Sequence, residues 1–225
     1  MNTPWEQGER RMFRDREDAG DALAERLAAY QGKNVLVLGI PRGGVVVAAQ
    51  LARRLDAELD VIVARKLGSP VSAELAIGAV TANGGLFLNE DILRELGVSD
   101  AYVEVVTAAQ RAEARRREEK FRRSRLPPTI AGRTVILVDD GLATGATMRA
   151  AVRSLRQASP GRLIAAVPVG AQEACAALRQ EVDELVCLHE PAFFGAVGAF
   201  YRDFRPTEDA EVERLLEEAR APAPA

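Results

Sequence analysis

Residues 135–148 constrain the fold of this chain more than any other stretch. They begin with four consecutive aliphatic residues, Val-Ile-Leu-Val, which is the pattern of a strand buried on both faces. Asp139 and Asp140 follow at once, and a run of small and hydroxyl residues then leads into a helix-forming segment from about Thr147. A buried strand joined to a helix by a short turn is the building unit of an α/β protein with a parallel sheet.

The turn of this unit predicts a ligand site. In open α/β sheets, ligands bind just beyond the carboxyl ends of the parallel strands. A turn of glycine and threonine residues that opens a helix offers free backbone N–H groups to a phosphate, and the helix dipole adds to the attraction. Two adjacent carboxylates would be costly to bury without a cation or a hydroxyl partner. We therefore expect a phosphorylated sugar here, with the carboxylates on ribose hydroxyls or on a metal ion.

Length and composition narrow the class of protein. The chain has 225 residues, of which 48% are hydrophobic and 28% charged, as is usual for a soluble globular protein with one large domain. A net charge of -3 gives no reason to expect nucleic acid or an anionic membrane as a partner. No run approaches the roughly 18 apolar residues of a membrane span, and the first residues lack the pattern of a secretory signal. We expect a cytoplasmic protein, with Cys175 and Cys187 as core residues rather than a disulfide framework or a metal cluster.

The remaining patterns predict further strands and helices. Strands are expected at 35–38, 59–64, 135–138, 163–169 and 184–188, and helices at 15–30, 45–55, 99–125, 147–157, 172–180 and 207–220. Two short apolar runs, 75–80 and 86–88, flank an Asn-Gly turn and should pair as an antiparallel hairpin. A short helix ending at Gly97 should follow them.

These elements predict a single α/β domain over residues 1–225, with a mainly parallel sheet flanked by helices. Its core should span about 33–190, with the hairpin and the long helix inserted. A C-terminal hood should comprise about 189–206 together with the N-terminal segment, and the Ala-Pro tail, 221–225, should be disordered.

The second half of the long helix mixes arginine and glutamate heavily. The main interpretation is a solvated helix laced with pairs of opposite charge one turn apart. The alternative is a basic face that contacts phosphate or a partner subunit.

Two further motifs lie at the ends of predicted strands. Residues 39–44, Gly-Ile-Pro-Arg-Gly-Gly, follow the first strand and open a helix, so their N–H groups can also face an anion. Arg65 and Lys66 come directly after the predicted strand at 59–64. Taken alone, a glycine-rich turn is often only structural and a dibasic pair is often a solvated edge.

Together these motifs resemble those of the type I phosphoribosyltransferases, which use 5-phosphoribosyl 1-diphosphate (PRPP). In that family an apolar strand, two acidic residues, a short spacer and Thr-Gly-x-Thr or Ser form the PRPP motif, and the order and spacing here match completely. The resemblance implies that Asp139 and Asp140 meet the ribose hydroxyls or a Mg²⁺ ion bound to them. It implies a cradle for the 5′-phosphate, made by Gly141, Ala143, Thr144, Gly145, Ala146 and Thr147. It also implies a pyrophosphate loop, made by Pro41, Arg42, Gly43 and Gly44.

The resemblance also implies a chemistry. A nitrogen nucleophile displaces pyrophosphate at the anomeric carbon of PRPP through an oxocarbenium-like transition state. Catalysis then rests on placement and charge stabilisation, with Mg²⁺ as the cofactor, held mostly through substrate oxygens and water. Lys66 is the preferred basic residue near the pyrophosphate and Arg65 the second. Residues 68–85 are the candidate for a mobile loop that excludes water.

The acceptor stays open. Hypoxanthine-guanine phosphoribosyltransferases carry an Asp just before Thr-Gly, where this chain has Ala143, so the chain looks more like the adenine or uracil enzymes in this respect. Phe193 and Tyr201 lie in the hood region, where an aromatic ring could stack on a base or simply fill a cap over the sheet. His189 is the only histidine, and a lone histidine is more often incidental than catalytic.

The expected function is a Mg-dependent transfer of phosphoribosyl from PRPP to a small nitrogenous base, as in nucleotide salvage. A non-catalytic regulator that senses PRPP or nucleotides is the alternative from another class, although no helix-turn-helix or basic domain supports it. A phosphoribosyl hydrolase, or transfer to a simple amine, is a third possibility. No nucleic acid or membrane partner is expected, and a homodimer is left open.

Overall fold

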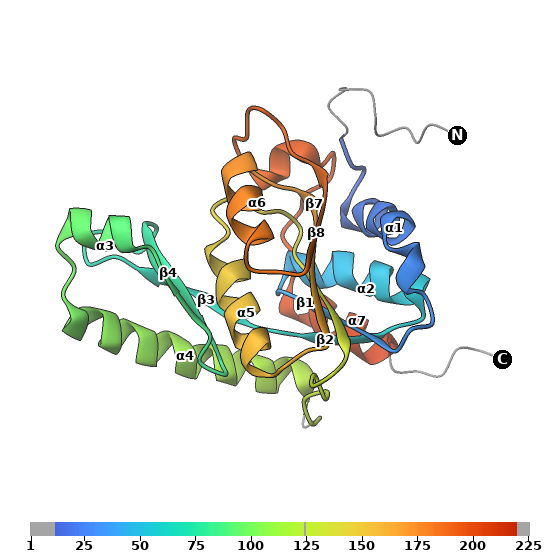
Figure 1. Cartoon of the computed structure of the whole chain (residues 1–225), viewed down its shortest axis with the longest axis horizontal. Helices are drawn as coiled ribbons and strands as arrows, with labels where there is room; N and C mark the ends of the chain where they lie inside the picture. The colour runs from blue at the N-terminus through green and yellow to red at the C-terminus, as the bar shows by residue number, and fades with distance from the viewer. Residues whose placement is uncertain (1–11, 124, 220–225) are drawn as a thin grey trace.

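The computed structural model describes residues 12–123 and 125–219, and a five-stranded parallel sheet lies at its centre (Figure 1). The strand order is β2-β1-β6-β7-β8. The strands are β1 (Val35–Gly39), β2 (Glu58–Val61), β6 (Thr134–Val138), β7 (Arg162–Val169) and β8 (Glu184–His189). The prediction of a mainly parallel sheet flanked by helices is confirmed.

Helices cover both faces of this sheet (Figure 1). One face packs against α1 (Arg16–Arg26) and α2 (Gly43–Leu55), and α7 (Asp209–Glu218) packs against α2. The other face packs against α5 (Ala146–Gln157) and α6 (Gln172–Arg179). Successive strand residues alternate between the two cores, as the two-residue period of a strand requires. Both faces are buried, which explains why these strands are continuously apolar in the sequence.

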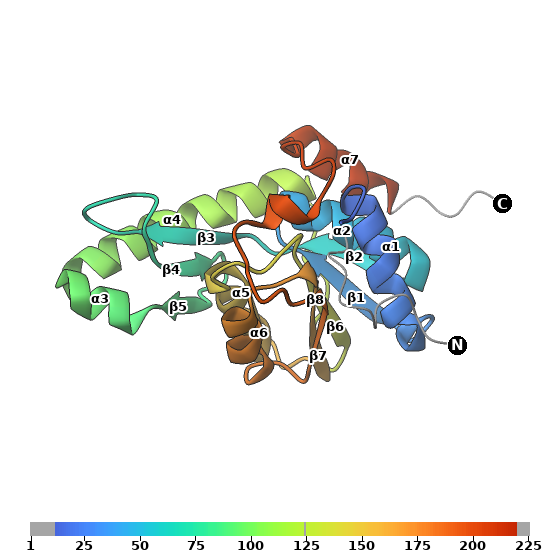
Figure 2. The same ribbon diagram turned by 90° about the horizontal axis from the view of Figure 1, so that it is seen from above.

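A second, antiparallel sheet forms an arm beside the main body (Figures 1 and 2). It has the order β3-β4-β5, with β3 (Ala64–Gly68), β4 (Ala76–Thr81) and β5 (Leu86–Leu88). The arm is completed by α3 (Glu90–Leu96) and the long α4 (Asp100–Arg122). The predicted hairpin is confirmed, because β4 and β5 pair antiparallel.

The predicted strand at 59–64 is confirmed only in its first part, because β2 ends at Val61 and a new strand, β3, begins at Ala64. Two side chains of α4 form hydrogen bonds with the backbone groups at this break. Arg122 donates to the carbonyl of Val61 at 2.7 Å, and Glu118 accepts from the N–H of Val63 at 2.9 Å. These bonds hold the chain where it leaves the parallel sheet and enters the arm. Because Glu118 and Arg122 lie more than fifty residues further on, no local pattern could have shown the break.

The candidate mobile loop at 68–85 is also largely ordered as sheet, since β4 occupies its second half. Only residues 69–75 connect β3 to β4 without a strand or helix, and the turn before β5 is short. The prediction missed β3, which pairs with β4 on the side opposite β5.

The long helix α4 differs in part from the solvated helix expected. Its pairs of opposite charge are present, as between Arg117 and Glu113 at 2.8 Å. Its inner face is buried, however, and carries Glu118 and Phe121. Arg122 binds both Glu118, at 2.8 Å, and Asp60 of β2, at 2.9 Å. This buried network ties the helix to the main sheet.

The remaining elements of residues 12–123 and 125–219 are two 3₁₀ turns, Ala28–Tyr30 and Val197–Phe200. Within the described residues, none of the helices combines the length and the apolar character needed to cross a membrane. The tail at 221–225, predicted to be disordered, lies outside the described residues.

Candidate functional site

The site begins where β1 and β6 end side by side. These strands are parallel neighbours, with Gly39 opposite Val138, so the segments that follow them leave the sheet at the same edge. Residues 40–44 and 139–147 therefore meet, although roughly a hundred positions separate them in the sequence. This is the edge at which α/β sheets bind ligands.

Glycines 43 and 44 make this meeting possible. A Cβ on Gly43 would overlap the Asp140 carboxylate and come within 2.6 Å of the Arg16 Nε. A Cβ on Gly44 would lie 2.9 Å from both the Cα and the Oδ1 of Asp139. Both residues also belong to the start of α2, whose first N–H groups face this edge. The predicted pyrophosphate loop thus packs directly on the acidic pair.

The rest of that loop is arranged around the same point. Pro41 is half-buried and is joined to Arg42 by a cis peptide bond. The Arg42 guanidinium lies 3.7 Å from Asp209 of α7. It therefore reaches toward α7.

The two carboxylates have different surroundings. Asp140 accepts from the Arg16 Nε at 2.8 Å, and both side chains are largely buried. Asp139 accepts from the backbone N–H of Asp140 at 2.9 Å. Burial raises the pKa of Asp139 well above its usual range, and the charge of Asp140 raises it further, whereas Arg16 and Lys66 act in the opposite direction. Asp139 is therefore a buried carboxylate that lies beside a second carboxylate.

The loop after the acidic pair is fastened at one residue and open around it. Leu142 is buried; its carbonyl accepts from the N–H of Ala171 at 2.8 Å, and its own N–H donates to the carbonyl of Val169 at 2.9 Å. Ala143 and Thr144 are exposed, and Thr147 is half-buried.

The same loop leaves a helix N-terminus open. Gly145 has φ 77°, a left-handed conformation that favours glycine, and it directly precedes α5. It carries no side chain to cap the helix, so the first N–H groups of α5 are left to a ligand or solvent.

Arg65 and Lys66 are not at the end of a parallel strand, as predicted, but inside β3. Neighbouring strand residues point to opposite faces, and the two side chains separate accordingly. Arg65 donates to Gln110 of α4 at 3.0 Å, whereas the Lys66 charge acts on Asp139. Both residues line a cleft of about 530 Å³ that Thr147 also lines. The Lys66 charge therefore acts at the acidic pair, whereas the Arg65 side chain is bound to α4.

The hood closes the other side of the site. Phe13 pairs with Tyr201 in an isolated parallel bridge, so the N-terminal segment and residues 197–204 form one unit. The Tyr201 hydroxyl donates to the carbonyl of Asp140 at 2.7 Å, and Tyr201 is only 5% exposed. Tyr201 thus supports the acidic pair from behind, and its ring is not presented for stacking. Phe193, by contrast, is 79% exposed.

Sequence reasoning missed Arg16. Its guanidinium bonds Asp140, donates to the carbonyl of Arg205 at 2.9 Å, and lies over the ring of Phe204 at 3.9 Å from the centroid. It thereby connects the hood to the acidic pair. Only its helix assignment could be made from the local pattern, because the partner is 124 positions away.

The geometry agrees with the comparisons to known proteins. The profile of a family described as the phosphoribosyl transferase domain matches residues 14–205. The chain belongs to the phosphoribosyl transferase family. A Mycobacterium tuberculosis (strain H37Rv) protein, provisionally named a phosphoribosyl transferase, is 46% identical over 209 residues, which cover 93% of this chain and 47% of that protein. The chain therefore spans about half the length of the curated relatives it matches.

Two further comparisons concern a solved structure and a shorter segment. TT1426 from Thermus thermophilus, whose crystal structure is known, is 47% identical in sequence to this chain. The two structures have a TM-score of 0.78, and the match covers 92% of this chain and 98% of TT1426. A uracil phosphoribosyltransferase from Nocardioides sp. is 41% identical over 61 residues, 27% of this chain and 29% of that enzyme.

Proposed function

We propose that this chain binds PRPP with Mg²⁺ and transfers its 5-phosphoribosyl group to a nitrogen atom of a small acceptor, releasing pyrophosphate. The observation that carries the proposal is the packing of Gly43 and Gly44 on Asp139 and Asp140, beside the loop that opens α5. Two helix N-termini then flank one pair of carboxylates. This arrangement suits a ribose that carries a phosphate at one end and a diphosphate at the other.

Each group has a part in such a reaction. The backbone at 143–147 and the hydroxyls of Thr144 and Thr147 would hold the 5′-phosphate. The N–H groups at the start of α2 would hold the pyrophosphate, and Lys66 would stabilise the negative charge that develops on it as the glycosidic bond breaks. The carboxylates would orient the ribose hydroxyls and stabilise positive charge on the ring. No nucleophilic side chain is required, because the acceptor nitrogen attacks directly.

The residues at this edge fit Mg²⁺. Mg²⁺ prefers oxygen ligands and keeps several water molecules or substrate oxygens, as carboxylates at an open edge allow. The raised pKa of Asp139 is that of a buried carboxylate that lies beside a second carboxylate. Asp139 and Asp140 would hold the ion, which neutralises phosphate charge when bound.

The acceptor side is defined less by the chain. Ala143 has no acidic or basic side chain. The acceptor nitrogen must therefore be nucleophilic without the help of a general base at position 143. The exposed Phe193 ring supports stacking on a planar base. The segment similar to a uracil phosphoribosyltransferase makes uracil the first acceptor to test.

A pyrophosphate-release assay with PRPP and Mg²⁺ tests the proposal across uracil, purines and simple amines. We expect turnover with at least one acceptor, and Asp140→Asn should abolish it while the melting curve stays cooperative. Asp91→Asn is the matched control, because that carboxylate is 91% exposed on α3.

Two results would contradict the proposal. Full activity of Asp140→Asn would show that the site assignment is wrong. Tight PRPP or nucleotide binding without turnover for any acceptor would favour the sensor alternative instead.

A further inference from the structure

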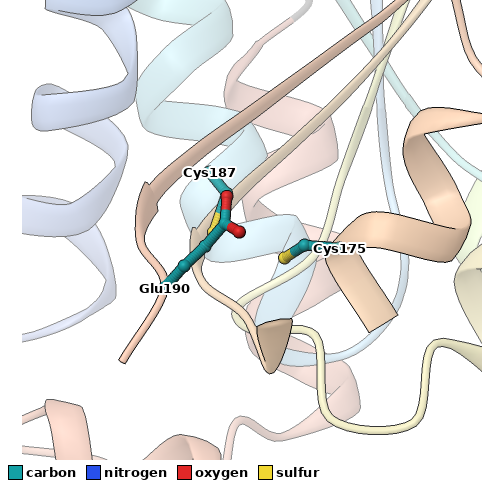
Figure 3. A group of neighbouring side chains, drawn as sticks. All are labelled: Cys175, Cys187 and Glu190. Carbon is teal, nitrogen blue, oxygen red and sulfur yellow. The ribbon is translucent and has the colours of Figure 1, made fainter. Parts of the chain in front are cut away.

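Two cysteines and a glutamate converge on the side of the sheet opposite α1 and α2. Cys175 comes from α6, Cys187 from β8, and Glu190 from the residues just after β8 (Figure 3). The two Sγ atoms and a Glu190 carboxylate oxygen all lie within 4.8 Å of one another. Both thiols are free. The sequence analysis expected two core residues without a metal cluster, and for Cys175, which is fully buried, the core assignment holds.

The backbone is shaped to bring these side chains together. A Cβ on Gly170 would overlap the Cys175 sulfur and lie 3.3 Å from the Cys187 sulfur. A glycine at the end of β7 therefore leaves the room into which both thiols point. Cys187 also donates weakly to the carbonyl of His189 at 3.3 Å.

We propose that Cys175, Cys187 and Glu190 bind a thiophilic divalent metal ion, with Zn²⁺ as the typical case and solvent in the fourth position. Two thiolates and one carboxylate are a donor set that Zn²⁺ accepts and that Mg²⁺ and Ca²⁺ do not favour. Tetrahedral bonds of about 2.0–2.3 Å place ligand atoms roughly 3.3–3.8 Å apart. The three ligand atoms lie within 4.8 Å of one another, so they would move closer by at most about 1.5 Å to reach this spacing.

Arg179 completes the charge balance of this site. Two thiolates and a carboxylate around a divalent ion leave one net negative charge. The Arg179 guanidinium pairs with one oxygen of Glu190, and the carboxylate can ligate through the other. The Glu190 side chain is 25% exposed, so an ion can enter from its side although Cys175 is closed to solvent.

A bound ion would be structural for the neighbouring loop. Gly170 forms an isolated bridge with Leu142, the residue that fastens the loop after the acidic pair. The metal would tie α6 and β8 together beside this junction. The inference does not depend on catalysis, since metal binding is measured without any substrate.

Titration of the reduced, metal-free full chain with Co²⁺ and then Zn²⁺ tests this site. Near-ultraviolet charge-transfer absorption arises where thiolates ligate Co²⁺, so it separates this site from Asp139 and Asp140. We expect one Co²⁺ per chain with this absorption, and its loss when Zn²⁺ displaces the ion. Glu190→Gln should weaken Zn²⁺ binding at least about tenfold. Glu173→Gln, which changes an exposed carboxylate on α6, should leave it unchanged.

Three outcomes would overturn the site. The first is the absence of thiolate absorption in the folded wild-type chain. The second is unchanged affinity in Glu190→Gln, a variant that keeps both thiols and so avoids a packing defect. The third is a chain that binds no metal but whose two thiols hydrogen peroxide oxidises to a disulfide, because the pair would then be a redox site.

Discussion

The Arg122 network is a buried polar cluster whose removal should destabilise the fold strongly. Arg122 donates to Asp60 at 2.9 Å, to Glu118 at 2.8 Å and to the carbonyl of Val61 at 2.7 Å. Asp60 and Glu118 are each only 4% exposed. Arg122→Met keeps most of the apolar stem but leaves two buried carboxylates without their cation.

The expected loss follows from this burial. Removing one partner of a buried ion pair costs about 3–5 kcal/mol, because the remaining charge is left uncompensated. For a domain of this size, 1 kcal/mol corresponds to roughly 2–4 °C, so the melting temperature should fall by roughly 6–20 °C. Urea unfolding and thermal melting followed by circular dichroism at pH 7 measure both quantities. Arg116→Met is the control, since Arg116 is 66% exposed and pairs with Glu113 on the helix surface, so this variant should lose far less stability than Arg122→Met.

The pH dependence separates a charge effect from a cavity. Burial raises the pKa of Glu118, and Arg122 opposes that rise. A carboxyl whose pKa is raised in the folded state stabilises the fold while protonated, and this contribution is lost as the pH rises through the raised pKa. Without Arg122 the pKa should rise further, so Arg122→Met should lose less stability at pH 5 than at pH 7. An equal loss at both pH values, or a loss under about 1 kcal/mol at pH 7, would refute the reasoning.

Four predictions concern the candidate site. Lys66→Met should lower kcat about 10²–10³-fold with little change in melting temperature, because it removes the cation proposed to stabilise the charge that develops on the leaving pyrophosphate; pyrophosphate release measures the change. Asp139→Asn should abolish turnover yet raise the melting temperature at neutral pH, because the raised pKa of Asp139 means that its ionised form destabilises the fold. This gain in melting temperature should vanish when the pH falls below the usual pKa range of a carboxyl group, where Asp139 is protonated. Gly43→Ala should weaken PRPP binding, measured by calorimetry, and cost about 1–3 kcal/mol of stability through overlap with Asp140. Phe193→Ala should raise the acceptor KM about 3- to 10-fold and leave the KM for PRPP unchanged, and equal changes in both would argue against stacking.

The parts of the candidate site that consist of consecutive residues could be predicted from the sequence. Asp139 and Asp140, the loop to Thr147, and Gly43 with Gly44 each follow a strand whose buried pattern is unambiguous. Parallel strands bring their carboxyl ends to one edge, so the meeting of the two segments follows once the sheet is inferred. Lys66 was assigned to this edge although the strand that carries it was not recognised.

Side chains that meet through distant elements could not be found in this way. The helix α1 begins and ends with an arginine, and nothing local distinguishes Arg16, which binds Asp140, from Arg26. Tyr201 looked like a stacking ring because aromatic residues gather in its segment, but packing against Phe13 buries it. The break between β2 and β3 depends on side chains of α4, a helix that comes much later in the chain.

The sequence by itself determined the α/β class, the alternation of parallel strands with helices, and the two anion-binding turns. The reason is that burial on both faces requires consecutive apolar residues and a tight turn requires glycine, so both features are visible in a short stretch of sequence. Only the tertiary structure decided that the arm is a separate antiparallel sheet, that Arg16 pairs with Asp140, and that Cys175 and Cys187 share one point with Glu190. Those contacts join segments far apart in the chain, and their energies depend on distance and desolvation, which a linear pattern does not contain.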